Sequence, residues 1–349
     1  MNILFAGKSD FNYNRVKVLR SGLEKFESVH LAYYSIPKRS SFDKNNFKIK
    51  ADWADYIFIP PFRHKDVGFL KSYTNTPIIF DPLISKYLTK LDYGHFWKLP
   101  IKYFLDLIPF KKADILLTDT RSHRDYFIGK FKLNPQTVFP LYIGSDTNLF
   151  FPAEKAPKKD KLFKVGFYGS FVPLQGAEKI VRAAALLKDQ TDISFEIIGG
   201  GYTFKKAKGI AQKEKLSNIT FKGNIEYEKL NETINSFDIC LGIFGDSLKA
   251  DLVIPNKIYH YASIGKAIIS RDTKGVRELF TDGLDILLCK STPNAIANSI
   301  LKLKADYELK EKLEKNAAAL IKNEYNEIKI AQSFIDIIQK YEDYTKSKG

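Results

Sequence analysis

The chain has 349 residues, 44% of them hydrophobic and 27% charged, which excludes a disordered chain and predicts two domains of roughly 150–200 residues each. Its two cysteines, Cys240 and Cys289, are too few for a disulfide framework or a zinc site, so we expect buried thiols in a reducing compartment. The net charge of +15 indicates an anionic partner, and nucleic acid, an anionic membrane and an anionic sugar nucleotide all fit it.

The first half of the chain predicts six strands. Short apolar, β-branched runs lie at residues 2–7, 28–34, 55–60, 77–81, 114–118 and 137–143. The N-terminal segment lacks the pattern of a signal peptide, and no window reaches the roughly 18 apolar residues that a spanning helix needs. We therefore expect a cytoplasmic protein.

The second half repeats the pattern. Strands are predicted at residues 164–169, 194–199, 218–223, 239–244, 267–271 and 286–289, and a helix at 176–189 has its apolar residues at three- and four-residue spacing. Nearly continuous apolar strands alternating with amphipathic helices are typical of parallel sheets covered on both faces. The sequence thus predicts an α/β protein with two Rossmann-like, doubly wound domains in tandem.

The domain boundary is predicted from composition. Residues 153–161 are rich in Lys and Pro and lack periodicity, as linkers do. We therefore expect an N-terminal domain over residues 1–152 and a C-terminal domain over 153–326. Residues 327–349 form an amphipathic helix that is expected to pack back towards the N-terminal domain. The first 152 residues hold 23 Lys and Arg against 14 Asp and Glu, and the rest hold 32 against 26, so the basic excess is denser in the first domain.

Glycine-bearing loops follow several strands, at the edge where open α/β sheets bind ligands. Gly7 and Lys8 follow the first strand, the loop from Gly169 to Gly176 follows the first strand of the second half, and three glycines at 199–201 follow the next. Glycines there allow backbone to approach a ligand, and a helix N-terminus favours phosphate. Neither of the first two loops matches a Walker loop or G-x-G-x-x-G, and tight structural turns remain the alternative.

Lys257 lies in the first turn of a predicted helix that begins at Pro255-Asn256. A cation is unfavourable there for the helix dipole, so a contact between Lys257 and a diphosphate is one interpretation. A solvated lysine is the other.

The second half resembles the donor-binding domain of retaining GT-B glycosyltransferases of family four. The matching segments, in order, are Ile143-Gly-Ser-Asp146 with Phe150-Phe-Pro152, Phe167-Tyr-Gly-Ser170 with Gln175-Gly-Ala-Glu178, Glu196-Ile-Ile-Gly-Gly-Gly201, Ile219-Thr-Phe-Lys-Gly223, the run from Val253 to Ile269, and Gly275-Val-Arg-Glu-Leu279 with Asp282-Gly283. In the first half, residues 79–87 and 112–123 look like the variant in bacterial surface-polysaccharide enzymes. Six segments in this order make a chance match improbable.

The resemblance implies a nucleotide-sugar donor on the C-terminal domain and an acceptor on the N-terminal domain, facing a cleft. It also implies retention of the anomeric configuration and no metal or other cofactor, and no Asp-x-Asp motif or histidine ligand spacing is present. Three positions depart from the family. Ser170 and Gln175 stand where Arg and Lys are usual, and His260 stands where Glu is expected to hold the ribose hydroxyls. The family's other glutamate falls on Leu252, beside Asp251.

Candidate site residues follow from these matches. The donor-binding set is Gly169, Ser170, Gln175, Gly200, Gly223, Asn224, Asn256, His260, Arg271 and Glu278, and the catalytic set is Asp81, Lys257 and His123. On the acceptor side we expect Gly7, Lys8, Ser85 and Tyr87. Asp81 is expected to act as a general base or to position the acceptor, with a cap of a helix at 82–88 as the alternative. The alternative for His123 is a capping or core role. The alternative for Arg271 is a surface salt bridge.

Residues 96–112 are aromatic and apolar and end in lysines. They predict either docking on an anionic membrane or a buried helix before the fifth strand. Lys38, Arg39, Lys48, Lys50, Arg63 and Lys65 would add to a basic face. The first interpretation places the protein peripherally on the inner face of the cell membrane.

Transfer of a sugar to a saccharide or lipid-linked acceptor, in the assembly of cell-surface polysaccharide, lipopolysaccharide or glycan, is the function the sequence favours. A non-catalytic GT-B scaffold in the same pathway is the alternative, because it would explain Ser170, Gln175 and His260 directly. We do not expect nucleic acid as a partner, because the sequence shows no recognisable nucleic-acid-binding module.

Overall fold

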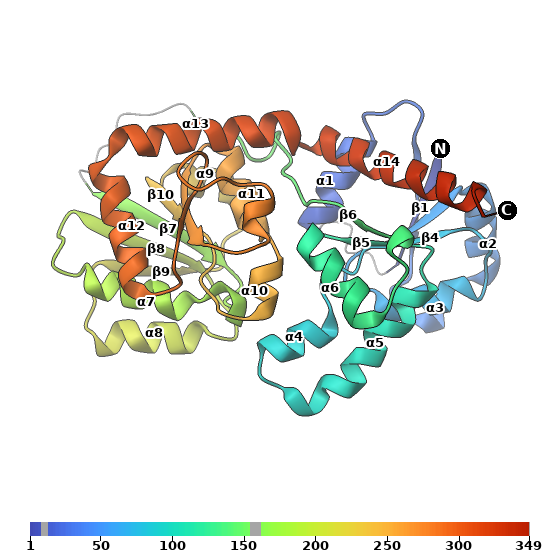
Figure 1. The fold of residues 1–349 in the computed structure, drawn as a ribbon, viewed down its shortest axis with the longest axis horizontal. Coiled ribbons are helices and arrows are strands. Elements are labelled where there is room, and N and C mark those ends of the chain that lie inside the picture. Colours follow the sequence, from blue (N-terminus) through green and yellow to red (C-terminus); the bar gives the residue numbers. More distant parts are fainter. Residues whose placement is uncertain (8–12, 154–161, 349) are drawn as a thin grey trace. The chain divides into compact units, whose positions relative to one another are not determined.

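The structure, a computed structural model, describes residues 1–7, 13–153 and 162–348. It divides into two compact units, one formed by Met1–Gly144 with Tyr325–Gly349 and the other by Ser145–Glu324 (Figure 1). Each unit holds a six-stranded parallel sheet covered by helices, which confirms the predicted α/β class with two Rossmann-like domains.

In unit 1 the sheet has the order β2-β1-β3-β4-β5-β6. Its strands are β1 (Asn2–Gly7), β2 (His30–Ser35), β3 (Tyr56–Ile59), β4 (Ile78–Phe80), β5 (Ile115–Thr118) and β6 (Val138–Pro140). Its helices are α1 (Asn14–Leu23), α2 (Lys44–Trp53), α3 (His64–Lys71), α4 (Lys86–Asp92), α5 (Leu99–Lys112), α6 (Arg121–Phe131) and α14 (Glu327–Lys346), with short 3-10 turns η1 (Arg39–Ser41), η2 (Phe96–Lys98) and η3 (Pro135–Thr137). The core lies between the apolar strands and the apolar faces of α1 and α14.

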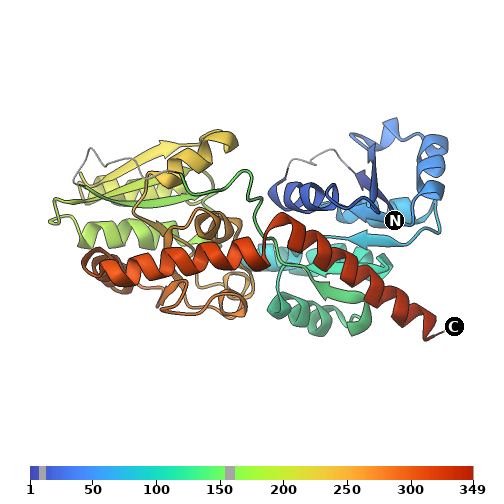
Figure 2. The same cartoon turned by 90° about the horizontal axis from the view of Figure 1, so that it is seen from above.

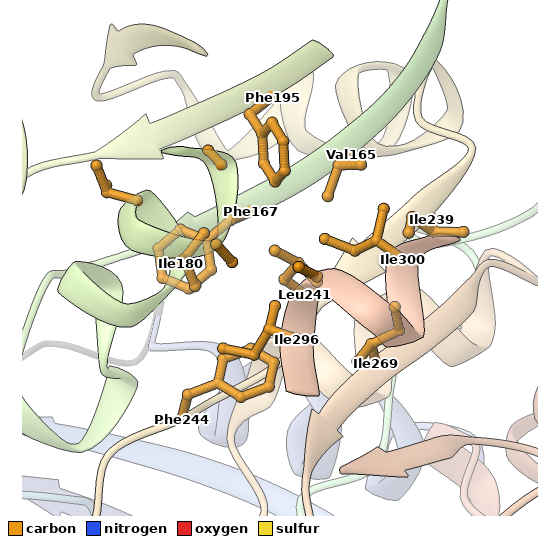
Figure 3. Close-up of a cluster of buried hydrophobic side chains, with 14 of the residues drawn as sticks. Val165, Phe167, Ile180, Phe195, Ile239, Leu241, Phe244, Ile269, Ile296 and Ile300 are labelled. Carbon is orange, nitrogen blue, oxygen red and sulfur yellow. The ribbon is translucent and has the colours of Figure 1, made fainter. Parts of the chain in front are cut away.

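Unit 2 has the sheet order β12-β11-β10-β7-β8-β9. Its strands are β7 (Phe163–Gly169), β8 (Ile193–Gly199), β9 (Ile219–Gly223), β10 (Ile239–Leu241), β11 (Ala267–Arg271) and β12 (Leu287–Cys289). Its helices are α7 (Ala177–Leu186), α8 (Phe204–Lys213), α9 (Leu230–Asn235), α10 (Leu248–Leu252), α11 (Asn256–Ser263), α12 (Pro293–Ala305) and α13 (Tyr307–Glu324), with η4 (Pro173–Gln175), η5 (Tyr227–Lys229) and η6 (Val276–Glu278). Figure 3 shows its core, where β-strand residues such as Val165 and Phe195 meet Ile180 from α7 and Ile296 from α12.

The last helix, α14, belongs to unit 1 and packs against α1 (Figures 1 and 2). Gly22 makes this contact possible, because a Cβ at that position would overlap the backbone carbonyl of Glu327. The apolar face of α14, including Ile330 and Phe334, is buried in the same core. The predicted return of the C-terminal helix to the N-terminal domain is confirmed.

The observed division lies eight residues before the predicted boundary at 152. Residues after Gly144 pack within unit 2: the Ser263 hydroxyl donates to the Phe150 carbonyl over 2.6 Å, and the Phe151 amide donates to Asn231 Oδ1 over 3.1 Å. At the other end, unit 1 resumes at Tyr325, two residues before the predicted start of the last helix. Composition marks the linker, but these contacts decide which unit the flanking residues join.

Candidate functional site

At the carboxyl edge of the unit 2 sheet, the loops after β7 and β8 pack backbone against backbone. Gly199 and Gly201 have φ angles of 112° and 147°, and a Cβ at either would overlap the carbonyl oxygen of Gly169 or Ser170. Gly200 differs, because a Cβ there would meet only Asn224 Oδ1, at 3.8 Å. Gly199 and Gly201 are therefore needed for loop packing, whereas Gly200 leaves an open, side-chain-free surface at the strand end.

Gln175 holds the loop that follows β7. Its side chain is buried, and its carbonyl Oε1 accepts a hydrogen bond from the Phe171 amide over 3.0 Å. Phe171 has a φ angle of 47°, a left-handed conformation that this hydrogen bond helps to maintain. Gln175 thus has a structural contact at the position where the family usually has a lysine, while the neighbouring Ser170 is exposed.

Lys257, in the first turn of α11, is 3% exposed. Its Nζ lies 3.6 Å from the centre of the Phe167 ring and 5.8 Å from that of Tyr168, and within the described residues it has no hydrogen-bond acceptor. Burial lowers the pKa of Lys257 well below its ordinary value. The alternative of a solvated lysine is wrong, since the amine is enclosed and no described carboxylate pairs with it.

His260, one turn later on α11, is enclosed by aromatic rings. Its ring stacks on Phe150 with centroids 3.7 Å apart, and its Nδ1 lies 2.6 Å from the hydroxyl of Tyr168. Nε2 is buried and has no partner in the part of the chain that is described. Burial lowers the pKa of His260 to about 3, so the imidazole is neutral at physiological pH. In this arrangement the ring presents no nitrogen to solvent for a ribose hydroxyl.

The remaining predicted donor residues lie near strand ends or helix starts of unit 2. Arg271, at the end of β11, donates from Nη1 to the Gly245 carbonyl over 2.6 Å, and its Nη2 lies 3.6 Å from Asp251 Oδ1. Asn256 begins α11, Gly223 ends β9 with Asn224 exposed after it, and Glu278 is half-buried at the end of η6. Arg271 is thus engaged by its own unit, in line with the salt-bridge alternative.

Asp81 follows β4 and is fully buried against Arg15 of α1, whose Nε donates to its carboxylate. Its other oxygen accepts from the Leu83 amide over 3.2 Å. Burial raises the pKa of Asp81, and the Arg15 charge opposes that rise. The predicted helix at 82–88 is observed at 86–92, and its cap is Ser85, which accepts from the Leu88 amide. Asp81 is therefore not a helix cap.

Arg15 is a residue that sequence reasoning missed. It is 2% exposed, and its Nη1 and Nη2 lack hydrogen-bond partners among the described residues. Its signal in the sequence is a single arginine just before the apolar positions Val16, Val18 and Leu19 of α1.

His123 and Asp119 form a buried pair after β5. Nδ1 of His123 lies 2.6 Å from Asp119 Oδ1, and its Nε2 has no partner within the described ranges. The cap of α6 is Thr120, which accepts from the His123 amide, so His123 is not the capping side chain. Asp119 was missed, although the Asp-x-x-x-His spacing across a strand end and a helix start could have indicated the pair.

Ser85 and Tyr87 are held by a third missed residue, Asp106 of α5. The carboxylate of Asp106 accepts from the Ser85 hydroxyl over 2.7 Å and from the Tyr87 amide over 2.8 Å. Gly7 ends β1, where a Cβ would come within 3.3 Å of Pro60, and Lys8 lies outside the described residues. Ser85 and Tyr87 therefore order α4 against α5, and the structure does not bring them to Asp81 by any described hydrogen bond.

Among the described residues no three His, Cys, Asp or Glu side chains lie together as a metal site would require. In unit 2 the sheet edge offers an open glycine surface, the starts of α7 and α11, and one enclosed amine. In unit 1 the sheet edge offers two buried acid–base pairs. Groups of these kinds are the ones that a protein uses to bind an anionic nucleotide and to orient a hydroxyl group.

Residues 151–320 match the family model described as glycosyl transferases group 1. An uncharacterized glycosyltransferase of Methanocaldococcus jannaschii, MJ1069, is 25% identical over 257 residues, which cover 70% of this chain and 64% of that protein. The chain thus spans less than two thirds of that relative.

Two solved structures share the fold of nearly the whole chain. The Anabaena protein Alr3699/HepE, in complex with UDP, superposes with a TM-score of 0.74 at 13% identity, covering 97% of this chain and 100% of its own. A sucrose-phosphate synthase from Thermosynechococcus elongatus superposes with a TM-score of 0.76 at 14% identity, covering 97% and 98%.

Proposed function

We propose that the chain is a sugar-transferring enzyme, because it has the GT-B fold and its residues 151–320 match the family model of glycosyl transferases group 1. It takes a sugar from a nucleotide-sugar donor to a saccharide or lipid-linked acceptor in the assembly of surface polysaccharide, lipopolysaccharide or another glycan. The observation that carries the proposal is the family match of unit 2. Retention of configuration and independence from a metal belong to the same proposal, through the sequence resemblance to family four.

Unit 2 supplies the donor site in this proposal. The open surface at Gly200 accommodates the flat part of the nucleotide, and the N-terminal ends of α7 and α11 favour its diphosphate. Lys257 is the cation for the departing diphosphate, because an enclosed amine without a counter-charge gains most from an anion placed within its reach. Unit 1 supplies the acceptor site, where Asp81 and the Asp119–His123 pair orient a hydroxyl group.

Within the Asp119–His123 pair, the carboxylate can only accept when it is ionised. Nδ1 of His123 then carries the proton, and Nε2 is left as a hydrogen-bond acceptor. This is the tautomer that would receive a hydrogen bond from an acceptor hydroxyl. The pair thereby supports a role for His123 in orienting the acceptor, with Asp119 as its positioning residue.

A thermal-shift panel of UDP, GDP, ADP and CMP with their common sugar conjugates tests the donor site. A ligand that binds only the folded protein raises the melting temperature as its concentration increases. We expect one nucleoside diphosphate to raise it clearly, and UDP is the first to try because the Anabaena structure of the same fold contains it. No rise with any member of the panel would contradict the proposal.

A non-catalytic GT-B scaffold is the second candidate function. One observation favours it: Gln175 and His260, at positions where the family has charged ligand-binding residues, are buried in contacts of the protein with itself. Such a scaffold would bind nucleotide weakly or not at all. The panel therefore separates the two candidates.

Peripheral contact with an anionic membrane is also part of the proposal, through α5 and the η2 turn before it. Trp97, Ile101, Phe104 and Ile108 are 71%, 65%, 56% and 52% exposed, and their spacing places them on one face. The opposite face, with Asp106 and Phe110, is buried in unit 1. Lysines at 98, 102, 111 and 112 flank the exposed apolar face, which suits an anionic bilayer. In the described part of the chain no helix is long and apolar enough to cross a membrane.

Vesicle binding tests this face. In a Trp53→Phe background, Trp97 is the single tryptophan, so its emission reports on that face alone. We expect a blue shift with vesicles that contain phosphatidylglycerol and a loss of binding in Ile101→Ser/Phe104→Ser. Ile49→Ser, at a 71% exposed position of α2, is the matched control. An unchanged emission, or equal binding by both variants, would contradict the membrane contact.

A further inference from the structure

Unit 1 contains a basic pocket of about 270 Å³ beyond the ends of β2 and β3. Of the described residues that line it, five are cationic and one is a carboxylate: Lys38, Arg39, Arg63, Lys65 and Lys86, with Asp66. These residues come from four places in the chain: the loop into η1, the turn after β3, the start of α3 and the start of α4. The fold thus gathers positive charge from separate segments around one hollow.

Among the described residues that line the pocket, the one carboxylate does not balance the cations. Asp66 is 3% exposed and is held by Arg63, whose Nε donates to it. Arg39 donates from Nη2 to the Lys65 carbonyl over 2.9 Å and lies 4.7 Å from the centre of the Phe69 ring, so its guanidinium is fixed in place. Lys38 and Lys65 form no ion pair with any described carboxylate, whereas Asp106 lies near Lys86 and accepts a hydrogen bond from its backbone amide over 3.0 Å.

Lys86 lies among charges of both signs. Its pKa is lowered, first by burial; Asp106 opposes the shift, and the neighbouring charges of Lys102, Lys65 and Arg63 lower the pKa further. Like charges held this close are unfavourable unless an anion joins them, and a bound anion would relieve the repulsion.

The volume indicates the size of that anion. Pockets that enclose a whole drug-sized ligand are about 300–1,000 Å³, so this one is suited to a smaller group. Phosphate and diphosphate are small, carry high charge and are bound by Lys and Arg through charge-assisted hydrogen bonds.

We propose that this pocket of unit 1 binds a phosphate or diphosphate group of the acceptor. The five cations hold the phosphoryl oxygens, and the rest of the acceptor extends from the pocket. That the phosphate belongs to an acceptor rests on the proposed transferase function, whereas the anion site itself does not. Lys86 begins α4, which packs against α5, the helix that also carries the exposed apolar face.

Titration calorimetry with inorganic diphosphate tests the site, in the presence of saturating UDP to occupy the donor side. Lys38→Glu/Lys65→Glu changes two exposed lysines of the pocket, and Lys48→Glu/Lys111→Glu makes the same charge change at two exposed lysines outside it. We expect at least tenfold weaker diphosphate binding in the pocket variant and a change of less than twofold in the control. Equal weakening in both variants, or none in either, would overturn the proposal.

Further experiments identify the source of the phosphate and control for misfolding of the variant. Farnesyl diphosphate that binds more than tenfold tighter than diphosphate supports a lipid-linked acceptor, and equal affinities support a water-soluble phosphate. Lys65→Gln, with a smaller charge change, repeats the comparison if the double variant melts early. If the protein binds diphosphate in the pocket but binds no nucleotide, the anion site is supported and the transferase function is refuted.

Discussion

At the scale of single residues, the enclosed amine of Lys257 carries most of the proposed mechanism. It is buried against Phe167 without an acceptor in the described part of the chain, which costs folding free energy unless an anion binds nearby. Residues that lower stability in this way are concentrated at functional sites. The aromatic contact offsets part of the cost, since a cation near a ring face is stabilised.

Lys257→Met tests the phosphate assignment without creating a cavity. The methionine keeps the aliphatic stem on Phe167, so we expect the free energy of unfolding to rise by about 1–3 kcal/mol as the unpaired amine is removed. Binding of the nucleoside diphosphate should weaken at least tenfold and binding of the nucleoside less than twofold. Calorimetry with both ligands measures the ratio. Equal weakening of both would mean that Lys257 acts through the fold.

His260 makes the stability of unit 2 depend on pH. The folded ring stays neutral down to about pH 3, whereas an unfolded histidine takes up a proton near pH 6.5, so the unfolded state binds more protons between these values. Stability should therefore fall as the pH drops from 6.5 towards 3, by up to about 1.4 kcal/mol per unit. The buried Lys257 acts in the same direction below its ordinary pKa of 10.5.

Urea unfolding at several pH values, on the chain and on His260→Phe, measures this effect. The variant should show a shallower fall in stability between pH 6.5 and 4, because it lacks the titrating ring. Carboxylates titrate in both proteins and cancel in the difference. Parallel curves for the two proteins would rule out His260 as the source.

At the scale of elements, the contact between α1 and α14 decides which unit the C-terminal helix joins. Gly22→Ala would push a methyl group into the Glu327 carbonyl, and we expect unit 1 to lose about 1–3 kcal/mol. Gly129→Ala in α6 is the matched control, since nothing lies within 4 Å of its added Cβ, and it should gain about 0.5–1 kcal/mol. Denaturant unfolding compares the two. A loss in Gly129→Ala equal to that in Gly22→Ala would show that the α1–α14 contact is not the cause.

The strands were predictable from the sequence, and several of the residue contacts were not. Parallel strands buried on both faces are continuous apolar runs, so each of the twelve predicted runs overlaps an observed strand. The start of α4 was placed too early, because Asp81 before Pro82 has the pattern of a cap while the fold commits it to Arg15. Pairing between elements that are far apart in sequence leaves no local pattern, which is why Arg15, Asp106 and Asp119 were missed.

Burial also escaped prediction at Lys257 and His260. Lysine and histidine are ordinary surface residues by type, and only the packing of Phe150, Phe167 and Tyr168 around these two removes them from water. The departures from the family at Gln175 and His260 were visible in the sequence, but the structural roles of these two residues could be identified only from their contacts in the structure.

At the scale of the whole molecule, the basic excess has distinct uses in the two units. Unit 1 gathers cations around a small pocket and beside the apolar face of α5, and unit 2 encloses the amine of Lys257 at the edge of its sheet. A net charge of +15 would by itself suit nucleic acid as well. The grouping of charge into a small pocket and a single buried amine favours small phosphorylated ligands instead.

The most direct test of the central claim is release of nucleoside diphosphate from sugar nucleotides, measured with a membrane extract as the source of acceptor. The account predicts that one sugar nucleotide releases its diphosphate with this chain and that Lys257→Met reduces the rate by about tenfold or more. Release that requires the extract would link the donor site of unit 2 to an acceptor. A chain that binds a nucleoside diphosphate but releases none above the Lys257→Met rate, with any donor, would contradict the claim and favour a non-catalytic scaffold.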